Sequence, residues 1–337
     1  MDALAGPGVM LPAMTGLPEG FSTRPPTLED ADDVAALLAA GAFPGSGEGD
    51  VTPEVVRDDW ADLDIGEETI AVISPEGQIA GYADVLNRSY VAVSVYGYVH
   101  PDFQGLGVGS FLVAWGEDWT RDHMPLAPED ARVSVTHYID SRKTAARNLL
   151  ESAGYTPVRG TYVMNIQLRE PPPEPLWPGG MTARTFVPDE DERAVFEAVE
   201  DSFKDVWNRP KGTFERFAEM TERETFDPSL WFLAMDGEEI AGMVLAKTIS
   251  GEGWVDVVGV RRPWRGLGLG LALLRHAFSE YQRRGIEKVG LSVDAESITG
   301  APRLYGRAGM SVASEYVVYQ KELRPGVDLG KRSEEPA

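Results

Sequence analysis

The feature that most constrains the fold is an internal repeat, because the second half of this 337-residue chain restates the first. Four blocks recur in the same order, beginning with STRPPTLEDADDVAALLAA at Ser22 and TARTFVPDEDERAVFEAVEDSF at Thr182. Each half then continues with two apolar segments around a turn, a glycine-rich loop, and a last strand-and-helix pattern. Four collinear matches are improbable by chance, so the sequence predicts two tandem copies of one α/β unit.

The local patterns within each copy indicate the same elements. The first block is a short strand followed by acidic residues, such as Asp30 and Asp191, which suit the positive end of an amphipathic helix. The second block reads ETIAVISPEGQIAGYADVL in one copy and SLWFLAMDGEEIAGMVLAK in the other. Two strands around a glycine-containing turn are typical of a β-hairpin.

A proline-rich segment separates the copies. Residues 169–181 (REPPPEPLWPGGM) hold five prolines and two adjacent glycines, which cannot continue a helix or a central strand. We therefore expect an extended linker between one domain at 22–168 and a second domain at 182–323. A loosely ordered lead-in is expected at 1–21, and a tail at 324–337.

Charge and composition exclude several classes of protein. The net charge of −23 repels phosphate backbones and anionic membranes, so we expect neither nucleic acid nor a membrane as partner. The chain has no cysteine and four scattered histidines, which excludes disulfides, thiolate chemistry and the spacing of a zinc site. No apolar run approaches the roughly 20 residues of a membrane span, and the first residues lack a signal-peptide pattern. We expect a cytoplasmic protein without a bound metal.

The glycine-rich loop is the most informative motif. In the second copy a β-branched strand at 255–260 runs into RRPWRGLGLG, and a helix pattern follows up to Gly285. Glycines leave the backbone N–H groups uncovered at the positive end of the helix, which suits a pyrophosphate. A Walker loop would need Lys-Ser or Lys-Thr after the last glycine, and a dinucleotide fold would need G-x-G-x-x-G near the start of its domain. Neither pattern is present, and recurrence in both copies argues against a merely structural turn.

At these residues the chain resembles the GCN5-related N-acetyltransferase (GNAT) superfamily, whose signature is Q/R-x-x-G-x-G/A. The resemblance covers both halves and implies α/β domains with a mixed, mainly antiparallel central sheet flanked by helices, and acetyl-CoA as co-substrate. In the first half the matching cofactor positions are Val99, Gln104, Gly105, Gly107 and Gly109. In the second half the resemblance assigns the pantetheine arm to Val258, Gly259 and Val260, the pyrophosphate to the amides of Arg265, Gly266, Leu267, Gly268, Leu269, Gly270 and Leu271, and a further pantetheine contact to Ser297. Arg261 and Arg262 would add to a local cationic patch.

Acetyl transfer to an amine needs a base for the amine proton and an acid for the departing thiolate. The family's Leu-Tyr pair matches Leu304-Tyr305, so Tyr305 is the candidate acid, the alternative being a packed helical tyrosine. Asp256 is the candidate base, because its apolar neighbours in WVDVVGV would raise its pKa. It shares a strand face with Trp254, where many relatives have glutamate. A hydrogen-bonded aspartate or a water relay remains the alternative.

The first half differs at the acid, because Leu150 stands where the second half has Tyr305. This difference predicts a catalytically degenerate copy. Tyr138 and Tyr155 lie nearby in sequence, so an active first half is the alternative. The aromatic residues of the second half that could line an acceptor pocket, or simply pack in the core, are Phe203, Trp207, Phe214 and Trp231.

The sequence therefore predicts a tandem N-acetyltransferase, and thus an enzyme, whose second half moves acetyl from acetyl-CoA to a small-molecule primary amine by direct attack. The absence of cysteine agrees with a mechanism that needs no acyl-enzyme. The alternatives are a non-catalytic acyl-CoA sensor and an acetyltransferase for a protein or peptide terminus. The tandem layout is similar to that of mycothiol synthases, but Trp254 argues against extending their substrate to this chain. We expect a monomer, since a tandem pair can imitate a dimer of single domains.

Overall fold

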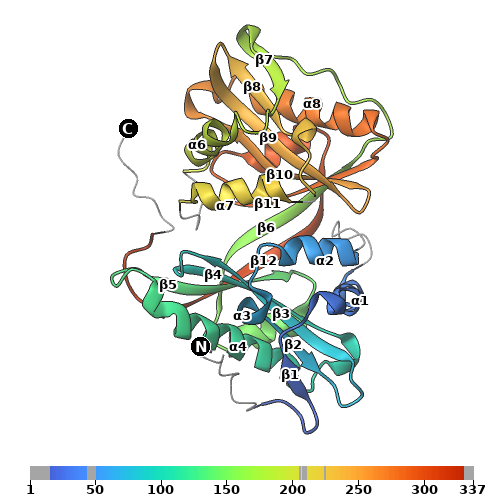
Figure 1. Ribbon diagram of the computed structural model, residues 1–337, viewed down its shortest axis with the longest axis vertical. Helices are drawn as coiled ribbons and strands as arrows, with labels where there is room; N and C mark the ends of the chain where they lie inside the picture. The colour runs from blue at the N-terminus through green and yellow to red at the C-terminus, as the bar shows by residue number, and fades with distance from the viewer. Residues whose placement is uncertain (1–15, 44–50, 205, 207–210, 224, 330–337) are drawn as a thin grey trace, which may run out of the picture.

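The computed structural model describes residues 16–43, 51–204, 206, 211–223 and 225–329, which form two lobes (Figure 1). The first half contains β1 (Ser22–Arg24), α1 (Ala31–Gly41), α2 (Pro53–Trp60), α3 (Ile65–Glu68), β2 (Thr69–Ile73), β3 (Ile79–Arg88), β4 (Ala92–Val99), α4 (Val108–His123), β5 (Val133–Asp140), α5 (Thr144–Ser152) and β6 (Thr156–Gln167). The second half contains β7 (Thr182–Thr185), α6 (Glu192–Ser202), α7 (Phe214–Glu219), β8 (Phe232–Asp236), β9 (Glu239–Ile249), β10 (Glu252–Val260), α8 (Leu269–Arg283), β11 (Lys288–Asp294), α9 (Ala301–Arg307) and β12 (Ser311–Arg324). Short 3₁₀ turns connect several of these elements.

One sheet of twelve strands runs through both lobes, in the order β1-β2-β3-β4-β5-β12-β6-β11-β10-β9-β8-β7. Its described strands pair antiparallel except for β4 with β5 and β10 with β11, which are parallel. The predicted class, two tandem α/β copies with mixed and mainly antiparallel sheets flanked by helices, is confirmed.

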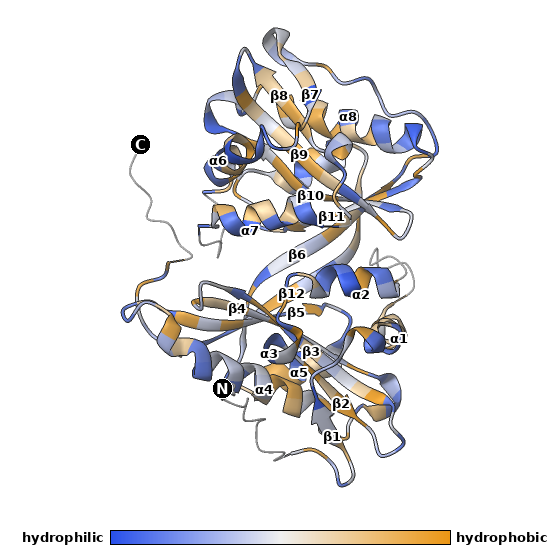
Figure 2. Ribbon diagram, in the orientation of Figure 1, coloured by the Kyte–Doolittle hydropathy of each residue, from blue (hydrophilic) through white to orange (hydrophobic). Residues whose placement is uncertain are grey.

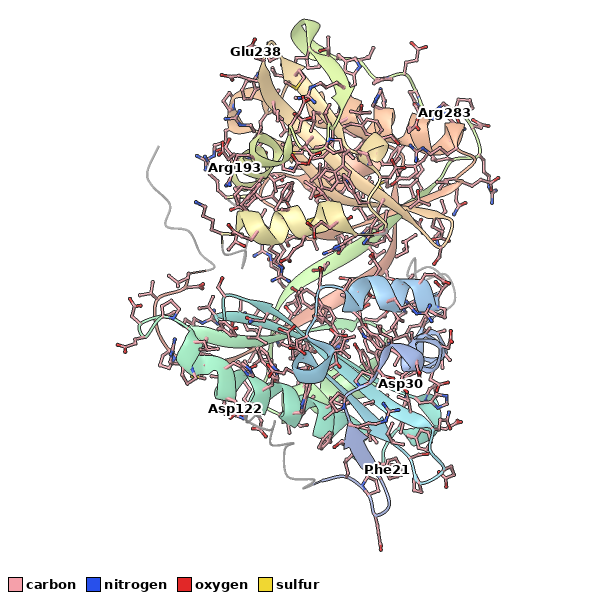
Figure 3. All side chains as sticks on the ribbon, viewed as in Figure 1. Phe21, Asp30, Asp122, Arg193, Glu238 and Arg283 are labelled. Atoms are coloured by element: carbon pink, nitrogen blue, oxygen red, sulfur yellow. The ribbon has the colours of Figure 1, made fainter. Side chains whose placement is uncertain are left out.

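Both copies begin with the same strand-to-helix junction, which an arginine–aspartate pair holds. Arg24 Nη2 lies 2.7 Å from Asp30 Oδ1, and Arg184 Nη1 lies 2.5 Å from Asp191 Oδ2. Each aspartate also accepts a backbone N–H from the preceding turn. The arginine hydrogen bonds lower the pKa of both carboxyls, so these acidic residues are ionised where the helix begins (Asp30 is labelled in Figure 3).

The two halves exchange their last strands. β6 ends the first half, and its residues 161–167 pair with the whole length of β11 in the second half. β12, which ends the second half, pairs with β5 of the first half, and β6 and β12 pair with each other between the lobes. Figure 1 shows both strands crossing from one lobe to the other. The sheet is therefore continuous between the two halves that the linker at 169–181 separates in sequence. Each half contributes its last strand to the sheet of the other. Of the expected lead-in and tail, residues 1–15 and 330–337 lie outside the described residues.

Each lobe has its own apolar core under the long helix that follows the glycine loop. α8 buries Leu273 and Phe278 against the sheet of the second half, and α4 buries Leu112 and Trp115 in the first. Each fully buried apolar side chain of this size contributes about 1.5–3 kcal/mol to folding. In Figure 2 hydrophobic colour runs along strands inside each lobe, such as β9 and β2, whereas β6 between the lobes is pale. The two cores fix the helices that begin at the glycine loops.

Candidate active site

In each half the two parallel strands pair at one end and then separate. The pairing of β10 with β11 ends at Trp254 and Gly290, and the pairing of β4 with β5 ends at Ser94 and Thr136. Beyond these points the facing backbone groups of β10 and β4 have no strand partner on that side, so they are available to an extended ligand. The resulting gap, called the wedge below, contains the positions predicted to hold the pantetheine arm in the second half: Val258, Gly259 and Val260.

Each wedge opens toward its glycine loop. Gly266 and Gly268 have φ values of +77° and +90°, and Gly105 and Gly107 have +77° and +91°. This left-handed conformation strongly favours glycine. A Cβ added at Gly266 or Gly268 would meet nothing within 4 Å, so the loop of the second half leaves its backbone uncovered. α8 begins directly after Gly268, and its N-terminus adds a positive field suited to a phosphate group.

A third glycine brings the strand, the loop helix and the last helix of each copy into contact. A Cβ at Gly270 would lie 3.0 Å from Leu304 Cδ2 and 3.6 Å from Val260 Cγ2. In the first half a Cβ at Gly109 would lie 3.1 Å from Leu149 Cδ2 and 3.6 Å from Val99 Cγ2 at the end of β4. Both copies therefore place the helix that carries position 305 or 150 against the start of the loop helix.

Tyr305 lies on α9 inside this arrangement. It is 7% exposed, and burial raises the pKa of Tyr305 to about 12, so the phenol is protonated at neutral pH. The Tyr305 hydroxyl has no hydrogen-bond partner among the described residues. A protonated donor without a competing partner is what an acid for a thiolate requires. Leu150, at the matching position of α5, is 2% exposed and offers no proton.

Asp256 lies at a β-bulge that distinguishes the two wedges. The register of β10 against β9 shifts between Val255 and Val257, which leaves Asp256 as the extra residue. β4 pairs with β3 without such a shift, from Ala92 to Val99. A bulge redirects a side chain and often lies beside an active site. Asp256 is exposed, but desolvation by its surroundings raises its pKa, and Lys247 opposes the rise.

Acidic residues of the first half approach Asp256 across the gap between the lobes. Asp58 on α2 accepts from Lys247 Nζ at 3.0 Å and from Thr225 Oγ1 at 2.7 Å, and Asp62 pairs with Arg223. The neighbouring Asp59 is desolvated, which raises its pKa to about 6. α2 therefore brings carboxylates of one copy to the wedge of the other.

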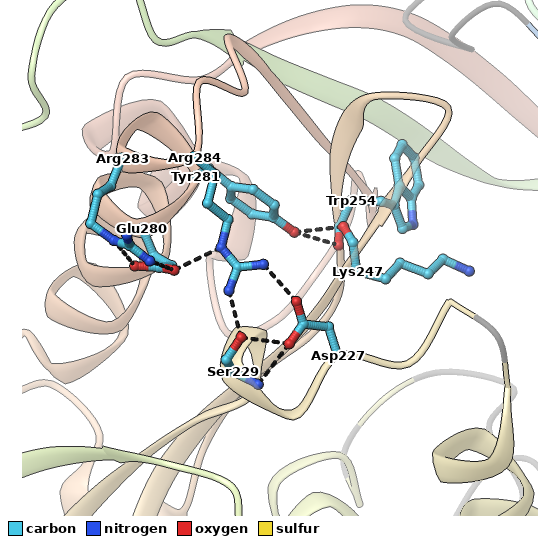
Figure 4. A network of polar contacts seen from close by, with 8 residues as sticks. All are labelled: Asp227, Ser229, Lys247, Trp254, Glu280, Tyr281, Arg283 and Arg284. Atoms are coloured by element: carbon cyan, nitrogen blue, oxygen red, sulfur yellow. Dashed lines mark hydrogen bonds and ion pairs between the residues drawn. The ribbon is translucent and has the colours of Figure 1, made fainter.

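The closed end of the second wedge is held by α8. The Tyr281 hydroxyl donates to the carbonyls of Lys247 (2.7 Å) and Trp254 (3.2 Å), as Figure 4 shows. The Trp254 ring covers Gly290, where an added Cβ would come within 2.8 Å of the ring. In the same view Arg284, the residue directly after α8, pairs with Asp227 at 2.6 Å. Trp254, at the position of the family's glutamate, thus fills space at the closed end of the wedge.

The arginines beside the second loop have protein partners. Arg261 Nε lies 3.1 Å from Asp201 Oδ2, and the Arg265 guanidinium donates to the carbonyls of Val260 (3.0 Å) and Ser202 (2.9 Å). The expected cationic patch is therefore partly neutralised. These contacts tie the loop to α6 and to the end of β10. The role of the Arg265 amide at a pyrophosphate stays a prediction.

The remaining predicted residues of the second half fall into two groups. Ser297 lies in the exposed turn after β11, where its hydroxyl is 2.9 Å from that of Thr299, and its contact with pantetheine stays a prediction. Trp231 is buried, and Phe214 packs on Phe196 with Arg193 stacked 3.5 Å from its ring centre. Phe203 packs against the same core, whereas Trp207 lies outside the described residues.

The first wedge contains a cavity of about 770 Å³. The five first-half positions that the resemblance assigned to the cofactor all line it: Val99, Gln104, Gly105, Gly107 and Gly109. Leu150 and His137 line it as well, whereas Tyr138 stacks on Tyr96 and Tyr155 is buried beside His137. The sequence did not point to His137, because a single histidine in an apolar strand usually packs in a core.

Two further searches cover only the described part of the chain. It contains no group of three or more His, Cys, Asp or Glu side chains arranged to hold a metal ion. It also contains no helix with the length and apolar character needed to cross a membrane.

Comparisons with known proteins agree with this geometry. The Acetyltransferase (GNAT) family matches residues 193–310, and an Acetyltransferase (GNAT) domain matches residues 66–157. The fold and the site thus define an acetyltransferase that uses acetyl-CoA, and each half contains a domain that matches this family.

Individual relatives extend over most of the chain. A mycothiol acetyltransferase of Streptomyces bingchenggensis is 32% identical over 255 residues, which are 74% of this chain and 79% of the relative. A solved GCN5-related N-acetyltransferase from Sphaerobacter thermophilus is 53% identical with a TM-score of 0.83, covering 94% of this chain and all of that one. The tandem GNAT protein from the clavulanic acid pathway shares the fold at 16% identity (TM-score 0.67, covering 91% of this chain and all of that one). The chain belongs to the GCN5-related N-acetyltransferase (GNAT) family.

Proposed function

We propose that the second half transfers the acetyl group of acetyl-CoA to the primary amine of a small molecule, by direct attack in a ternary complex. The pyrophosphate is placed on the loop amides of residues 265–271 and the pantetheine arm along the free edge of β10. The open loop glycines and the N-terminus of α8 support this placement. That several relatives are named mycothiol acetyltransferases supports a small-molecule acceptor.

The proposed chemistry uses two residues. The neutral amine nitrogen attacks the thioester carbonyl carbon, while Asp256, directly or through a water molecule, takes the amine proton. The carbon–sulfur bond breaks, and Tyr305 donates its phenolic proton to the departing sulfur, so that the products are an N-acetyl amide and CoA. The observation that carries the proposal is the protonated Tyr305 hydroxyl, free of hydrogen-bond partners in the described structure, on a helix packed against the loop helix.

The acceptor is proposed to enter from the gap between the lobes. A primary amine is cationic in water at neutral pH and must lose a proton before it attacks. Asp58 and Asp59 on α2 give the approach to Asp256 a negative field that attracts such a cation. In this proposal the first half shapes the acceptor site of the second.

The division of labour follows from the same residues. We assign transfer to the domain at 182–323 and a catalytically degenerate role to the domain at 22–168, because Leu150 replaces the acid. The strand exchange keeps the two domains in one unit, and we expect that unit to be a monomer.

A thiol-release screen over primary amines tests the proposal. We expect release of CoA that depends on both acetyl-CoA and an amine, and loss of that release in Tyr305→Phe. If acetyl-CoA binds well while every amine tested is inert, a non-catalytic acyl-CoA sensor is the better description.

A further inference from the structure

The two glycine loops differ in what lies over them. At Gly268, which precedes α8, an added Cβ would meet nothing within 4 Å. At the matching Gly107, which precedes α4, it would lie 2.8 Å from the carbonyl oxygen of Gly16. Both glycines have the same left-handed backbone, with φ values of +90° and +91°, so the loops themselves are alike. The difference comes from residues 16–21, which lead into β1 and are called the strap below.

Apolar contacts anchor the strap on the first half. Leu17 packs against the apolar core under α4. Phe21 is buried with its ring edge-on to Phe103, 5.9 Å between ring centres, just before the first glycine loop (Phe21 is labelled in Figure 3). The Phe21 amide donates to the Pro18 carbonyl at 3.2 Å, which closes a turn between the two anchors. These contacts fix the path that brings Gly16 to the loop.

The second half begins with a similar turn, but its loop is left open. The Met181 amide donates to the Pro178 carbonyl at 3.0 Å. Trp177, directly before this turn, packs edge-on to His276, 5.6 Å between ring centres and well inside α8. Leu176, the residue before it, is exposed. The linker therefore contacts α8 away from the glycine loop of the second half.

A carbonyl oxygen over Gly107 competes with a phosphate for the same place. The N-terminus of α4 carries a positive field, and the Gly16 carbonyl puts a partially negative acceptor there. A phosphate oxygen is attracted by the same field and would approach through the space that the missing side chain of Gly107 leaves. Two acceptor oxygens without a proton between them repel each other, so a phosphate has to displace the strap before it can bind.

We propose that the strap closes the first glycine loop to phosphate-bearing ligands, so that the intact chain takes CoA on the loop of the second half alone. Displacing the strap opens the first loop. None of the strap residues lines the cavity of the first half, so the strap acts on the loop and leaves the cavity walls unchanged. The strap shares with the proposed function the placement of CoA on the second loop, but it needs no acceptor amine.

Calorimetry with CoA, in the absence of amine, tests the strap in a full-length chain whose second loop is disabled. Gly266→Asp places a negative charge where the second loop would meet a pyrophosphate, at a position with open space. We expect this chain to bind CoA at least about tenfold more weakly than the wild type. Leu17→Ser, added to it, removes the apolar anchor and should restore one equivalent of CoA binding. Leu17→Met keeps an apolar side chain of similar volume and should restore none.

Two further measurements locate the effect at the phosphates of the first loop. Gly105→Asp should abolish the restored binding, because it places a negative charge on that loop at a position with open space. Pantetheine has no phosphate, and its affinity should change less than twofold when the strap is released. A chain that begins at Pro18 removes the Gly16 carbonyl outright and serves if Leu17→Ser leaves the strap in place. Of the described residues it loses Gly16 and Leu17, and neither is buried.

Three results overturn the proposal. The first is CoA binding by a Gly266→Asp chain with its strap intact that Gly105→Asp abolishes, because the first loop would then be open already. The second is a Gly266→Asp chain beginning at Pro18 that gains no CoA binding, and the third is an equal gain for pantetheine. If the wild type binds no CoA while the chain beginning at Pro18 binds one equivalent, the proposed function fails and the strap survives.

Discussion

Replacing Tyr305 by phenylalanine tests catalysis separately from stability. The hydroxyl has no hydrogen-bond partner among the described residues, and its pKa of about 12 keeps it protonated at neutral pH. The phenylalanine ring keeps the apolar contacts of α9 and removes one oxygen atom. No hydrogen bond is lost, so the free energy of unfolding should change by no more than about 0.5 kcal/mol. If the hydroxyl protonates the departing sulfur, kcat should fall about 10²- to 10⁴-fold, the usual range for a general acid.

The assay is CoA release at saturating acetyl-CoA and amine, together with urea unfolding of the same samples. Tyr281→Phe is the matched control, since its hydroxyl donates to the carbonyls of Lys247 and Trp254. It should lose about 1–3 kcal/mol of stability while kcat falls less than tenfold. A Tyr305→Phe chain that keeps kcat within threefold of the wild type refutes the role of Tyr305 as acid.

Three further predictions follow from the packing and the charges. Because β6 and β12 are exchanged, calorimetric unfolding should show one cooperative transition, and two separate transitions would contradict the exchange. Burial raises the pKa of Asp84 to about 7, so its ionised form destabilises the fold and stability is lost as pH rises from about 4 to 7. Asp84→Asn should therefore be more stable than the wild type by roughly 1–2 kcal/mol at pH 8 and by less at pH 5. Thermal melts that show the same stability difference at both pH values would count against the role of the Asp84 charge. Lys247→Met leaves Asp58 buried without its cation and should cost about 2–3 kcal/mol in urea unfolding. The same change removes a positive charge near Asp256, so the acidic limb of the kcat/KM profile should move to higher pH, and an unmoved limb would separate Asp256 from the base.

The sequence predicted what depends on local pattern. The repeat gave two copies of one α/β unit, and the glycine loops lie between strand and helix as the spacing indicated. The Leu304-Tyr305 pair lies on a helix, as the family resemblance implied, and the structure shows that this helix packs against the start of α8. The loop and helix patterns are each encoded within a short stretch of consecutive residues, and the repeat is found by comparing two such stretches.

The features that the sequence did not reveal depend on contacts between distant residues. β6 and β12 each end a copy, and their local pattern does not show which sheet they join. The bulge at Asp256 interrupts an ordinary β-branched strand without a glycine or proline at that residue. The path of residues 16–21 over the first glycine loop depends on packing against residues far along the chain. The carboxylates of α2 reach Asp256 across nearly 200 intervening residues.

The most direct test of the central claim, that the second half carries the transfer, is amine-dependent CoA release by the wild type and by the charged and uncharged variants at Gly266. That residue has φ +77° and open space around it, so both variants carry the same backbone cost and differ in charge. The account predicts that Gly266→Asp loses transfer, through a raised KM for acetyl-CoA, and that Gly266→Asn loses far less. Undiminished transfer in Gly266→Asp would contradict the account and move the reaction to the first half.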